Sequence, residues 1–374
     1  MRVRRDHWRD QIPLICFVRL SVLWSERAHL ATIQPRFWPR LLLILVTSLA
    51  IAPLNGLQQL LYGRRIRATA VHPRPIFVLG HWRSGTTHLH NLLALDPRFA
   101  VVANQQCITP EASLVGGRWL RRLMSLLLRP ERPMDRMAWS PDSPQEEETA
   151  VAKSAPVSIH AAFQFPTQAQ DLFDRRVLQE PPGYAAVLLR VLRIATLHGG
   201  GRPLVLKSPS HTAQIPLLLR LFPEARFVFL HRDPWAVYAS TLHVHARVLP
   251  RTALEPYSRP CIQANVLALY RRLMGSYLRE RQRIPEGQLV EIAYADLDAD
   301  PLTTLERLYD ALDLGPFEPH RQRVAAYVDQ QRGHRRNRLQ LSAADRELVS
   351  AHWAFAVEAF GYGRAALAGA GHAR

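Results

Sequence analysis

The chain has 374 residues, enough for one large α/β domain or two smaller ones, and its hydrophobic fraction of 48% is ordinary for a globular protein. The formal net charge of +17 is high, and the 48 basic residues include only two lysines, Lys153 and Lys207. A positive field favours an anionic ligand, a membrane surface or nucleic acid, but no nucleic-acid-binding module appears in the sequence, so we expect no nucleic-acid partner.

Residues 1–74 form a basic N-terminal region with twelve arginines and three acidic residues. The longest apolar run of the chain lies inside it, at residues 41–54, and extends to residue 61 if three polar side chains are admitted. The run is shorter than the roughly 20 residues of a spanning helix, and it begins too late for a signal peptide. Three interpretations of residues 41–61 therefore remain: a buried helix, a membrane span, or a helix that lies in the membrane interface. Arginines on both sides of the run would suit the interfacial helix. The interfacial interpretation predicts binding to anionic membranes without a span.

From residue 75 the pattern becomes typical of an α/β domain, which we assign to residues 75–374. Short apolar strands are predicted at residues 76–79, 204–206, 227–230 and 289–292. Helices are predicted to begin near residue 86 and to cover residues 111–128, 145–154, 184–197, 213–221, 234–245, 270–283 and 302–312. Strands separated by helices predict a parallel sheet with both faces covered. Residues 129–144 and 249–260 are rich in proline and arginine and are predicted to be surface loops or lids.

The strongest motif stands between the first predicted strand and the helix after it. It reads Gly80-His81-Trp82-Arg83-Ser84-Gly85-Thr86-Thr87. Glycines allow tight turns, and backbone N–H groups and hydroxyls at a helix N-terminus suit phosphate or sulfate oxygens. The glycine spacing is that of a Walker A loop, but Thr86 stands where a nucleotide triphosphatase has its lysine, which argues against ATP or GTP hydrolysis. Arg83 lies inside the loop, so we expect it to face the bound anion.

The second motif follows the strand at residues 227–230 and contains Arg232, Asp233, Pro234 and Ser240. Asp233 is suited to cap the next helix, with Pro234 in its first turn. An arginine with a hydroxyl partner suits a phosphate monoester. Taken alone, an arginine at a strand end is more often part of a structural salt bridge, so the second motif indicates phosphate binding only in combination with the first.

Together the two motifs resemble those of the sulfotransferase superfamily, in particular its large bacterial branch, over roughly residues 75–315. The resemblance implies a P-loop NTPase-like three-layer α/β fold with a central parallel sheet, and 3′-phosphoadenosine-5′-phosphosulfate (PAPS) as co-substrate, with no metal. The loop residues His81, Trp82, Arg83, Ser84, Gly85, Thr86 and Thr87 would bind the 5′-phosphosulfate, and Arg232 and Ser240 the 3′-phosphate. The implied reaction is sulfuryl transfer to a hydroxyl or amine of a small-molecule, carbohydrate or lipid acceptor. A segment around Tyr294 also resembles the family, with a packing role.

The catalytic candidates are Arg83, Lys207 and His211. Lys207 ends a predicted strand and resembles the family's K-x-P segment, so it could stabilise the leaving 5′-phosphate, or it could form a surface salt bridge. His211 could be the base that takes the acceptor proton. The rival base is a carboxylate at residues 146–148, namely Glu146, Glu147 or Glu148, although acidic residues also simply favour a helix start. The sequence does not decide which of these four residues is the base.

Two other functions are compatible with the motifs: a P-loop kinase of a small metabolite, and a non-catalytic membrane-peripheral scaffold. The basic segment at residues 332–338 could close over a nucleotide or be a solvated run of charge. Cys16, Cys107 and Cys261 have no partner spacing, which argues against a disulfide framework or a zinc site. A reducing compartment fits best, so we expect a cytoplasmic protein, peripheral at the inner face of the membrane if the N-terminal region binds lipid.

Overall fold

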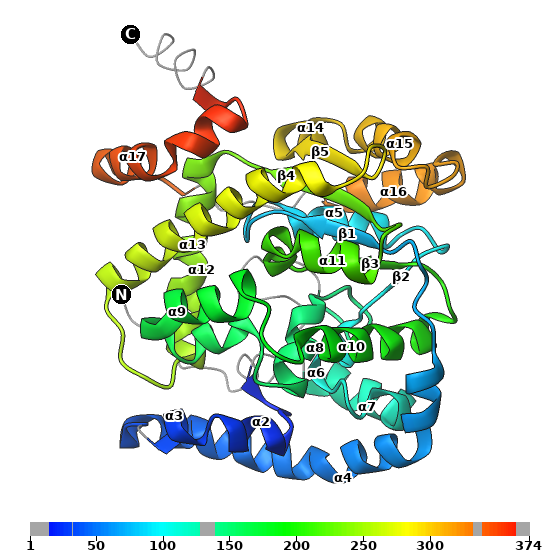
Figure 1. The fold of residues 1–374 in the computed structure, drawn as a ribbon, viewed down its shortest axis with the longest axis vertical. Helices are drawn as coiled ribbons and strands as arrows, with labels where there is room; N and C mark the ends of the chain where they lie inside the picture. Colours follow the sequence, from blue (N-terminus) through cyan, green and yellow to red (C-terminus); the bar gives the residue numbers. More distant parts are fainter. Residues whose placement is uncertain (1–14, 32, 128–138, 332–338, 364–374) are drawn as a thin grey trace.

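A computed structural model of the protein describes residues 15–31, 33–127, 139–331 and 339–363. Its centre is a five-stranded sheet in the order β2-β3-β1-β4-β5, in which all neighbouring strands are parallel (Figure 1). The strands are β1 (Ile76–Leu79), β2 (Ala100–Val101), β3 (Leu204–Leu206), β4 (Arg226–His231) and β5 (Leu289–Ala293). The predicted α/β fold with a central parallel sheet and its four predicted strands are confirmed. Strand β2 was not predicted, because two residues leave no periodicity to detect.

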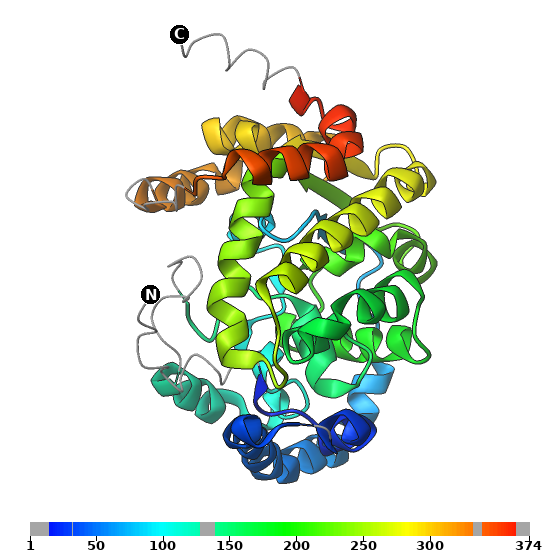
Figure 2. The ribbon, with the colours of Figure 1, turned by 90° about the vertical axis from the view of Figure 1, so that its left-hand side faces the viewer.

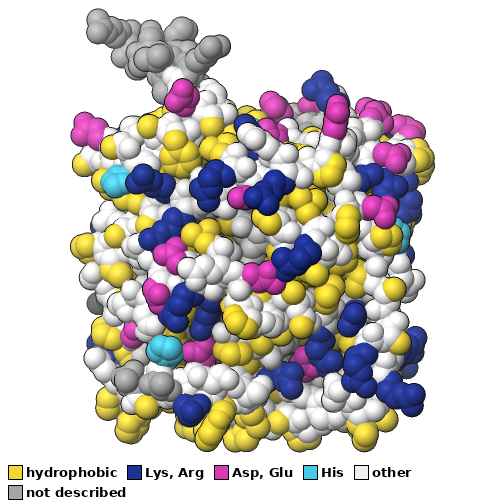
Figure 3. All heavy atoms as spheres, viewed as in Figure 1, with side chains coloured by type: hydrophobic (Ala, Val, Ile, Leu, Met, Phe, Trp, Pro, Cys, Tyr) yellow, Lys and Arg dark blue, Asp and Glu magenta, His cyan; other side chains and the backbone are white. Residues whose placement is uncertain are grey.

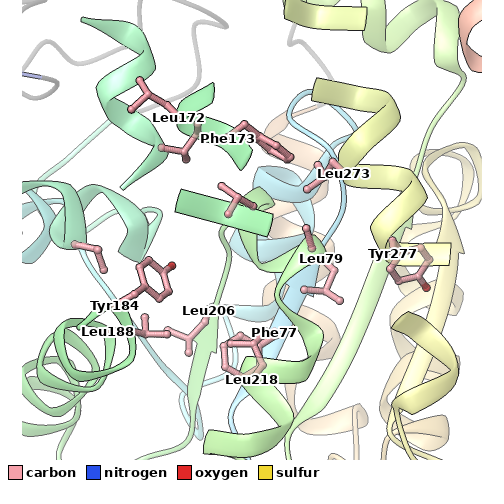
Figure 4. Close-up of a cluster of buried hydrophobic side chains, with 14 of the residues drawn as sticks. Phe77, Leu79, Leu172, Phe173, Tyr184, Leu188, Leu206, Leu218, Leu273 and Tyr277 are labelled. Carbon is pink, nitrogen blue, oxygen red and sulfur yellow. The ribbon is translucent and has the colours of Figure 1, made fainter. Parts of the chain in front are cut away.

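Helices cover both faces of the sheet, because alternate strand residues point to opposite sides. Phe77 and Leu79 of β1 pack in one hydrophobic cluster, and Ile76 and Val78 in the other. The first cluster is completed by helices α10 (Tyr184–Gly199), α11 (Ile215–Leu221) and α13 (Arg259–Glu280), and the second by α5 (Thr86–Leu93), α14 (Tyr294–Ala299), α15 (Pro301–Ala311) and α16 (Glu318–Gln331). Figure 4 shows Phe77 close to Leu206 of β3 and Leu218 of α11 in the first cluster.

The remaining helices in the described residues lie mainly on the side of the first cluster. They are α2 (Leu20–Ser25), α3 (Arg27–Ala31), α4 (Trp38–Ala68), α6 (Asn104–Ile108), α7 (Ser113–Leu127), α8 (Glu147–Ser154), α9 (Ala169–Phe173), α12 (Pro234–Thr252) and α17 (Ala343–Ala359), with short 3₁₀ turns between them. In the view turned by 90°, α12 runs from the sheet towards α3 and α4 (Figure 2).

The loop predicted at residues 249–260 is partly wrong. Helix α12 continues to Thr252, and α13 begins at Arg259. Two prolines suggested a break, but Pro250 lies in the last turn of α12 and Pro260 in the first turn of α13, where its missing N–H has no helical partner to lose. The predicted loop at 129–144 is described only from residue 139, and the basic segment 332–338 lies outside the described residues.

The helical N-terminal region is present as predicted, and α4 is its main element. This helix has 31 residues and continues through Pro53, well beyond the apolar run. By length and composition it could cross a membrane, and 22% of its most apolar stretch is buried. Helix α4 ends at Ala68 and β1 begins at Ile76, so the boundary predicted at residue 75 falls between them. That the two parts are separate domains stays a prediction.

Candidate active site

The loop predicted to bind phosphate, residues 80–87, connects β1 to α5 and has a constrained backbone. Gly80 and Gly85 have φ angles of 140° and 101°, and a Cβ atom on Gly80 would lie 2.5 Å from the Leu230 carbonyl oxygen of β4. The Gly80 N–H donates to Thr212 Oγ1 at 2.8 Å, which ties the loop to the 3₁₀ turn after β3. Arg83 has a φ of 72°, a costly conformation for a residue with a side chain. The surrounding contacts therefore hold Arg83 in place at the tip of the loop.

The two sequence motifs meet at Arg83. Its Nε donates to Ser240 Oγ at 3.0 Å, and its carbonyl oxygen accepts from Arg232 Nη1 at 3.3 Å. Asp233 caps α12 as predicted, since its carboxylate accepts from the Ala236 N–H at 2.8 Å. The parallel sheet explains this convergence, because the carboxyl ends of neighbouring strands β1 and β4 lie at the same edge.

Tyr294 supports both motifs, beyond the packing role expected of it. The Arg232 guanidinium lies over its ring, 4.4 Å from the centroid. A Cβ atom on Gly85 would come within 2.3 Å of the same ring, so only glycine fits there without a shift. Beside Arg232 is a hollow of about 330 Å³ whose lining includes Trp235, Tyr294 and Tyr362. Aromatic rings next to a guanidinium are suited to a nucleoside and its phosphate.

A second cavity, of about 200 Å³, borders the loop. His81, Trp82, Arg83, Thr86 and Thr87 of the loop line one end. The walls are mostly apolar and include Ile159, Phe163, Val244, Val248 and Leu269. The polar side chains of the lining include Glu146, His160 and His245, together with Arg247 and Arg251 of α12. Such a cavity can hold an apolar molecule with one polar group directed at the loop.

The three consecutive glutamates around the start of α8 point in three directions, as neighbours on a helix do. Glu146 lines the cavity, and its Oε1 lies 2.5 Å from Lys207 Nζ. Its Oε2 lies 3.7 Å from His160 Nε2. Burial by itself would raise the pKa of the Glu146 carboxyl, but the Lys207 ammonium and His160 outweigh it and hold that pKa well below the usual range. Glu146 is therefore ionised at neutral pH.

Glu147 and Glu148 are completely buried in structural contacts. Glu147 accepts from the Lys207 backbone N–H at 3.1 Å and lies 3.0 Å from His211 Nδ1, and the Tyr184 hydroxyl donates to Glu148 at 2.7 Å. Burial would raise the pKa of Glu147, but contact with His211 outweighs it and lowers that pKa. These two carboxylates join α8 to the end of β3 and to α10.

The structure separates the three catalytic candidates. Arg83 lies in the lining of the cavity, and its role towards a bound anion stays a prediction. Lys207 is 2% exposed and paired with Glu146, so the alternative of a surface salt bridge does not hold. His211 is 0% exposed, packs edge-on against Phe77, and is outside the set of described residues that line the cavity. The role of His211 as base stays a prediction that its position does not favour.

Two histidines in the cavity lining were missed by sequence reasoning. His160 faces Glu146, and His245 lies on α12, where burial lowers its pKa to about 4. Nothing in their local sequence separates them from the other histidines of the chain, sixteen in all. Within the described ranges, no cluster of three or more His, Cys, Asp or Glu side chains could hold a metal ion.

Comparisons with known proteins agree with this geometry. A model described as "Sulfotransferase family" matches residues 75–319. The omega-hydroxy-beta-dihydromenaquinone-9 sulfotransferase Stf3 of Mycobacterium bovis is 30% identical over 332 residues, covering 87% of this chain and 85% of that protein. The protein of the same name from Mycobacterium tuberculosis matches to the same extent.

Two solved structures share the fold. Sulfotransferase STF1 from Mycobacterium tuberculosis H37Rv has a TM-score of 0.65 at 22% identity, covering 80% of this chain and 81% of that one. Sulfotransferase STF9 from Mycobacterium avium has a TM-score of 0.63 at 20% identity, covering 82% and 81%. The P-loop-like architecture expected from the sequence therefore has experimental counterparts.

Proposed function

The chain belongs to the sulfotransferase family, and from this premise we propose that it transfers the sulfuryl group of PAPS to a hydroxyl group of an apolar, lipid-like acceptor. The observation that carries the proposal is the meeting of the two motifs at Arg83, through its contacts with Ser240 and Arg232. A donor that carries a 5′-phosphosulfate and a 3′-phosphate needs two anion-binding groups in one site, and these contacts support such an arrangement.

The residues present suit PAPS as the donor. The N-terminus of α5 and the loop hydroxyls offer N–H and O–H donors to the phosphosulfate, as helix N-termini commonly do for phosphates. Arg232, supported on the Tyr294 ring, offers a fixed cation to the 3′-phosphate. The hollow lined by Trp235 and Tyr362 would take the nucleoside. Because Thr86 replaces the lysine of a Walker A loop, a γ-phosphate has no dedicated partner in the loop.

In the proposed reaction the acceptor oxygen forms a bond to sulfur, and the bond from sulfur to the 5′-phosphate oxygen breaks. Adenosine 3′,5′-bisphosphate leaves, and negative charge grows on its bridging oxygen as it does so. A fixed cation beside that oxygen lowers the barrier, a role we assign to Arg83. The acceptor loses its proton in the same step.

We assign to Glu146 the role of the base that accepts the proton of the acceptor hydroxyl group. Of the four candidate bases, it is the one in the cavity lining, where its ionised carboxylate can accept a hydrogen bond from a hydroxyl group. Its lowered pKa makes it a weaker base than an ordinary carboxylate, so its position carries the assignment. Glu147, Glu148 and His211 are committed to buried contacts away from that lining.

An apolar acceptor is supported by the walls of the cavity, in which Val244, Val248 and Phe163 line the same space as Arg83. The mycobacterial relatives are named for an omega-hydroxylated dihydromenaquinone, which is a lipid-like alcohol. An amine acceptor would be less suited to Glu146, because an ammonium group would be bound in the cationic form that cannot attack sulfur.

The test is a pair of transfer assays on the same panel of lipid alcohols, one with PAPS labelled on sulfur and one with ATP labelled on the γ-phosphate. We expect sulfur label, and no phosphorus label, on at least one alcohol. Transfer of phosphorus would identify a kinase and overturn the proposal. As an acceptor control, Val244→Phe should reduce transfer to a dodecyl alcohol far more than it reduces binding of adenosine 3′,5′-bisphosphate. The added ring narrows the cavity proposed for the acceptor and leaves the hollow beside Arg232 unchanged.

A further inference from the structure

Helix α4 is apolar on both of its long sides, although only one side is covered by protein. Its buried side chains include Ile44, Ile51 and Ile66. The other side exposes Leu42, Leu49 and Leu60, which are 60%, 52% and 80% exposed. A helix at a protein–water boundary normally carries polar residues on its outer side. The outer side of α4 is therefore suited to a second, apolar environment.

The neighbouring helices enlarge this exposed region. Trp24 of α2 and Trp38 at the start of α4 are 70% and 58% exposed. Figure 3 shows hydrophobic side chains gathered along the lower edge of the molecule, where Figure 1 places α2, α3 and α4. Helix α7, which packs on α4 through Leu120 and Ile51, exposes Trp119 as well. We call the exposed side chains Trp24, Trp38, Leu42, Leu49 and Leu60 the apolar face.

The helices that carry the apolar face have an excess of positive charge. Exposed arginines stand at both ends of α4, with Arg36 before it and Arg64, Arg65 and Arg67 in its last turns. Between residues 15 and 68 the only acidic residue is Glu26, which is already paired with Arg176 at 2.7 Å. An apolar surface edged by arginines and tryptophans complements the interface of an anionic bilayer, where tryptophan rings and cationic side chains are favoured.

Helix α4 is attached to the protein along its length, which does not suit a membrane span. Arg40 donates to the carbonyl oxygens of Pro250 and Ala253. Eighteen residues further on, the buried Gln58 donates to the Pro110 carbonyl oxygen at 3.1 Å and accepts from the Leu114 N–H at 2.8 Å. These points are about 27 Å apart along a helix, nearly the thickness of a bilayer core. A spanning α4 would have to break both sets of contacts.

The same contacts place the apolar face beside one end of the acceptor cavity. The lining of the cavity follows α12 from Thr241, next to Ser240, to Leu249 and Arg251 at the other end of the helix. Arg40 of α4 binds the carbonyl oxygens of Pro250 and Ala253, at this same end of α12. Along α12 the cavity therefore reaches about 15 Å from the nucleotide site towards the N-terminal region.

We propose that the protein docks on an anionic bilayer with α4 lying in the membrane interface, and that acceptors pass from the bilayer into the cavity at the junction of α4 and α12. The route for the acceptor rests on the proposed function, whereas the docking does not. Exposed leucines and tryptophans insert into the interface, and the flanking arginines bind lipid phosphates. The catalytic loop then faces the cytoplasmic solution, from which PAPS enters.

The experiment is flotation of the full chain with phosphatidylglycerol-containing vesicles and with phosphatidylcholine vesicles, at low and high salt. We expect binding to the anionic vesicles that weakens with salt and is extracted by alkaline carbonate. Leu42→Glu should weaken binding about tenfold or more, since it removes an inserted leucine and adds a repelling charge. Gln322→Glu, which adds the same charge on an exposed position of α16 at the opposite end of the molecule, is the matched control and should bind as the unaltered protein does.

Equal binding by the two variants, resistance to carbonate, or no flotation of the unaltered protein would each overturn the docking proposal. Light scattering after gel filtration tests whether the apolar face binds a second copy of the chain instead of a membrane. If the unaltered protein is a dimer and Leu42→Glu is a monomer, the apolar face is a dimer interface and the docking proposal is wrong. Thermal stabilisation by adenosine 3′,5′-bisphosphate is measured on every variant. If it persists while flotation fails, only the docking is wrong; if it is missing from the unaltered protein, the proposed function is wrong instead.

Discussion

Replacing Glu146 by glutamine tests the assignment of the base. Glutamine has nearly the same shape, and its amide oxygen can still accept from Lys207 Nζ, so the fold should persist. It cannot accept a proton, however, and loss of a general base typically costs two to four orders of magnitude in rate. We expect kcat to fall about 100-fold or more, equivalent to about 2.7 kcal/mol of barrier, with binding of adenosine 3′,5′-bisphosphate retained.

The pH dependence gives an independent check. Because the pKa of Glu146 lies below its ordinary value of 4.5, the carboxylate is present throughout the neutral range and is lost only as the pH falls below that value. We therefore expect no acid limb in kcat between pH 8 and about 5.5, whereas a base with the ordinary histidine pKa near 6.5 would give one. The assay is transfer of labelled sulfate to the best lipid alcohol at saturating concentrations.

The matched control is Glu147→Gln, the same change one residue along α8. Glu147 binds the Lys207 backbone and His211, so its loss should lower the stability by about 1–3 kcal/mol with a change in kcat of less than about tenfold. If Glu146→Gln keeps its turnover while Glu147→Gln or His211→Asn abolishes it, the reasoning from the cavity lining is refuted.

Three further predictions concern binding, catalysis and stability. Arg232→Ala should weaken the binding of adenosine 3′,5′-bisphosphate by about 2 kcal/mol, measured by calorimetry, and should leave the binding of adenosine 5′-phosphate nearly unchanged. Equal losses for the two nucleotides would show that Arg232 does not bind the 3′-phosphate. Arg83→Ala should lower kcat about 100-fold in single-turnover transfer assays, and full activity would contradict the role of the loop. His90 is completely buried, which lowers its pKa to about 4, so the stability present above pH 6.5 is lost as the pH falls towards 4. His90→Gln should remove up to about 2 kcal/mol of the difference in stability between pH 7 and pH 5 measured by urea unfolding, and an unchanged difference would exclude His90 as its source.

The parts of the fold that the sequence predicted are those with strong local signals. The four longer strands are short apolar runs next to turn residues. The loop predicted to bind phosphate has two glycines and three hydroxyl side chains within residues 80–87. Proline misled where its position in the helix decides its effect, as at Pro250 near the end of α12. Strand β2 has no local signal, since its pairing with β3 depends on the sheet already being formed.

The candidate site was predictable only in part, because the base is chosen by tertiary structure. Nothing in the local sequence distinguishes Glu146, Glu147 and Glu148 from one another. Only the packing of α8 directs one of them to the cavity. His160 reaches Glu146 from a turn that no motif marks. His211 follows a family-like segment, yet the turn after β3 directs its ring into the core.

The central claim is that two motifs form one site for a nucleotide with a 3′-phosphate. The most direct measurement is calorimetric titration of the protein with adenosine 3′,5′-bisphosphate, ADP and ATP under identical conditions. Charge-assisted contacts of Arg232 to the 3′-phosphate predict that the bisphosphate binds at least about tenfold more tightly than either of the others. Equal affinities, or a preference for ATP, would contradict the account.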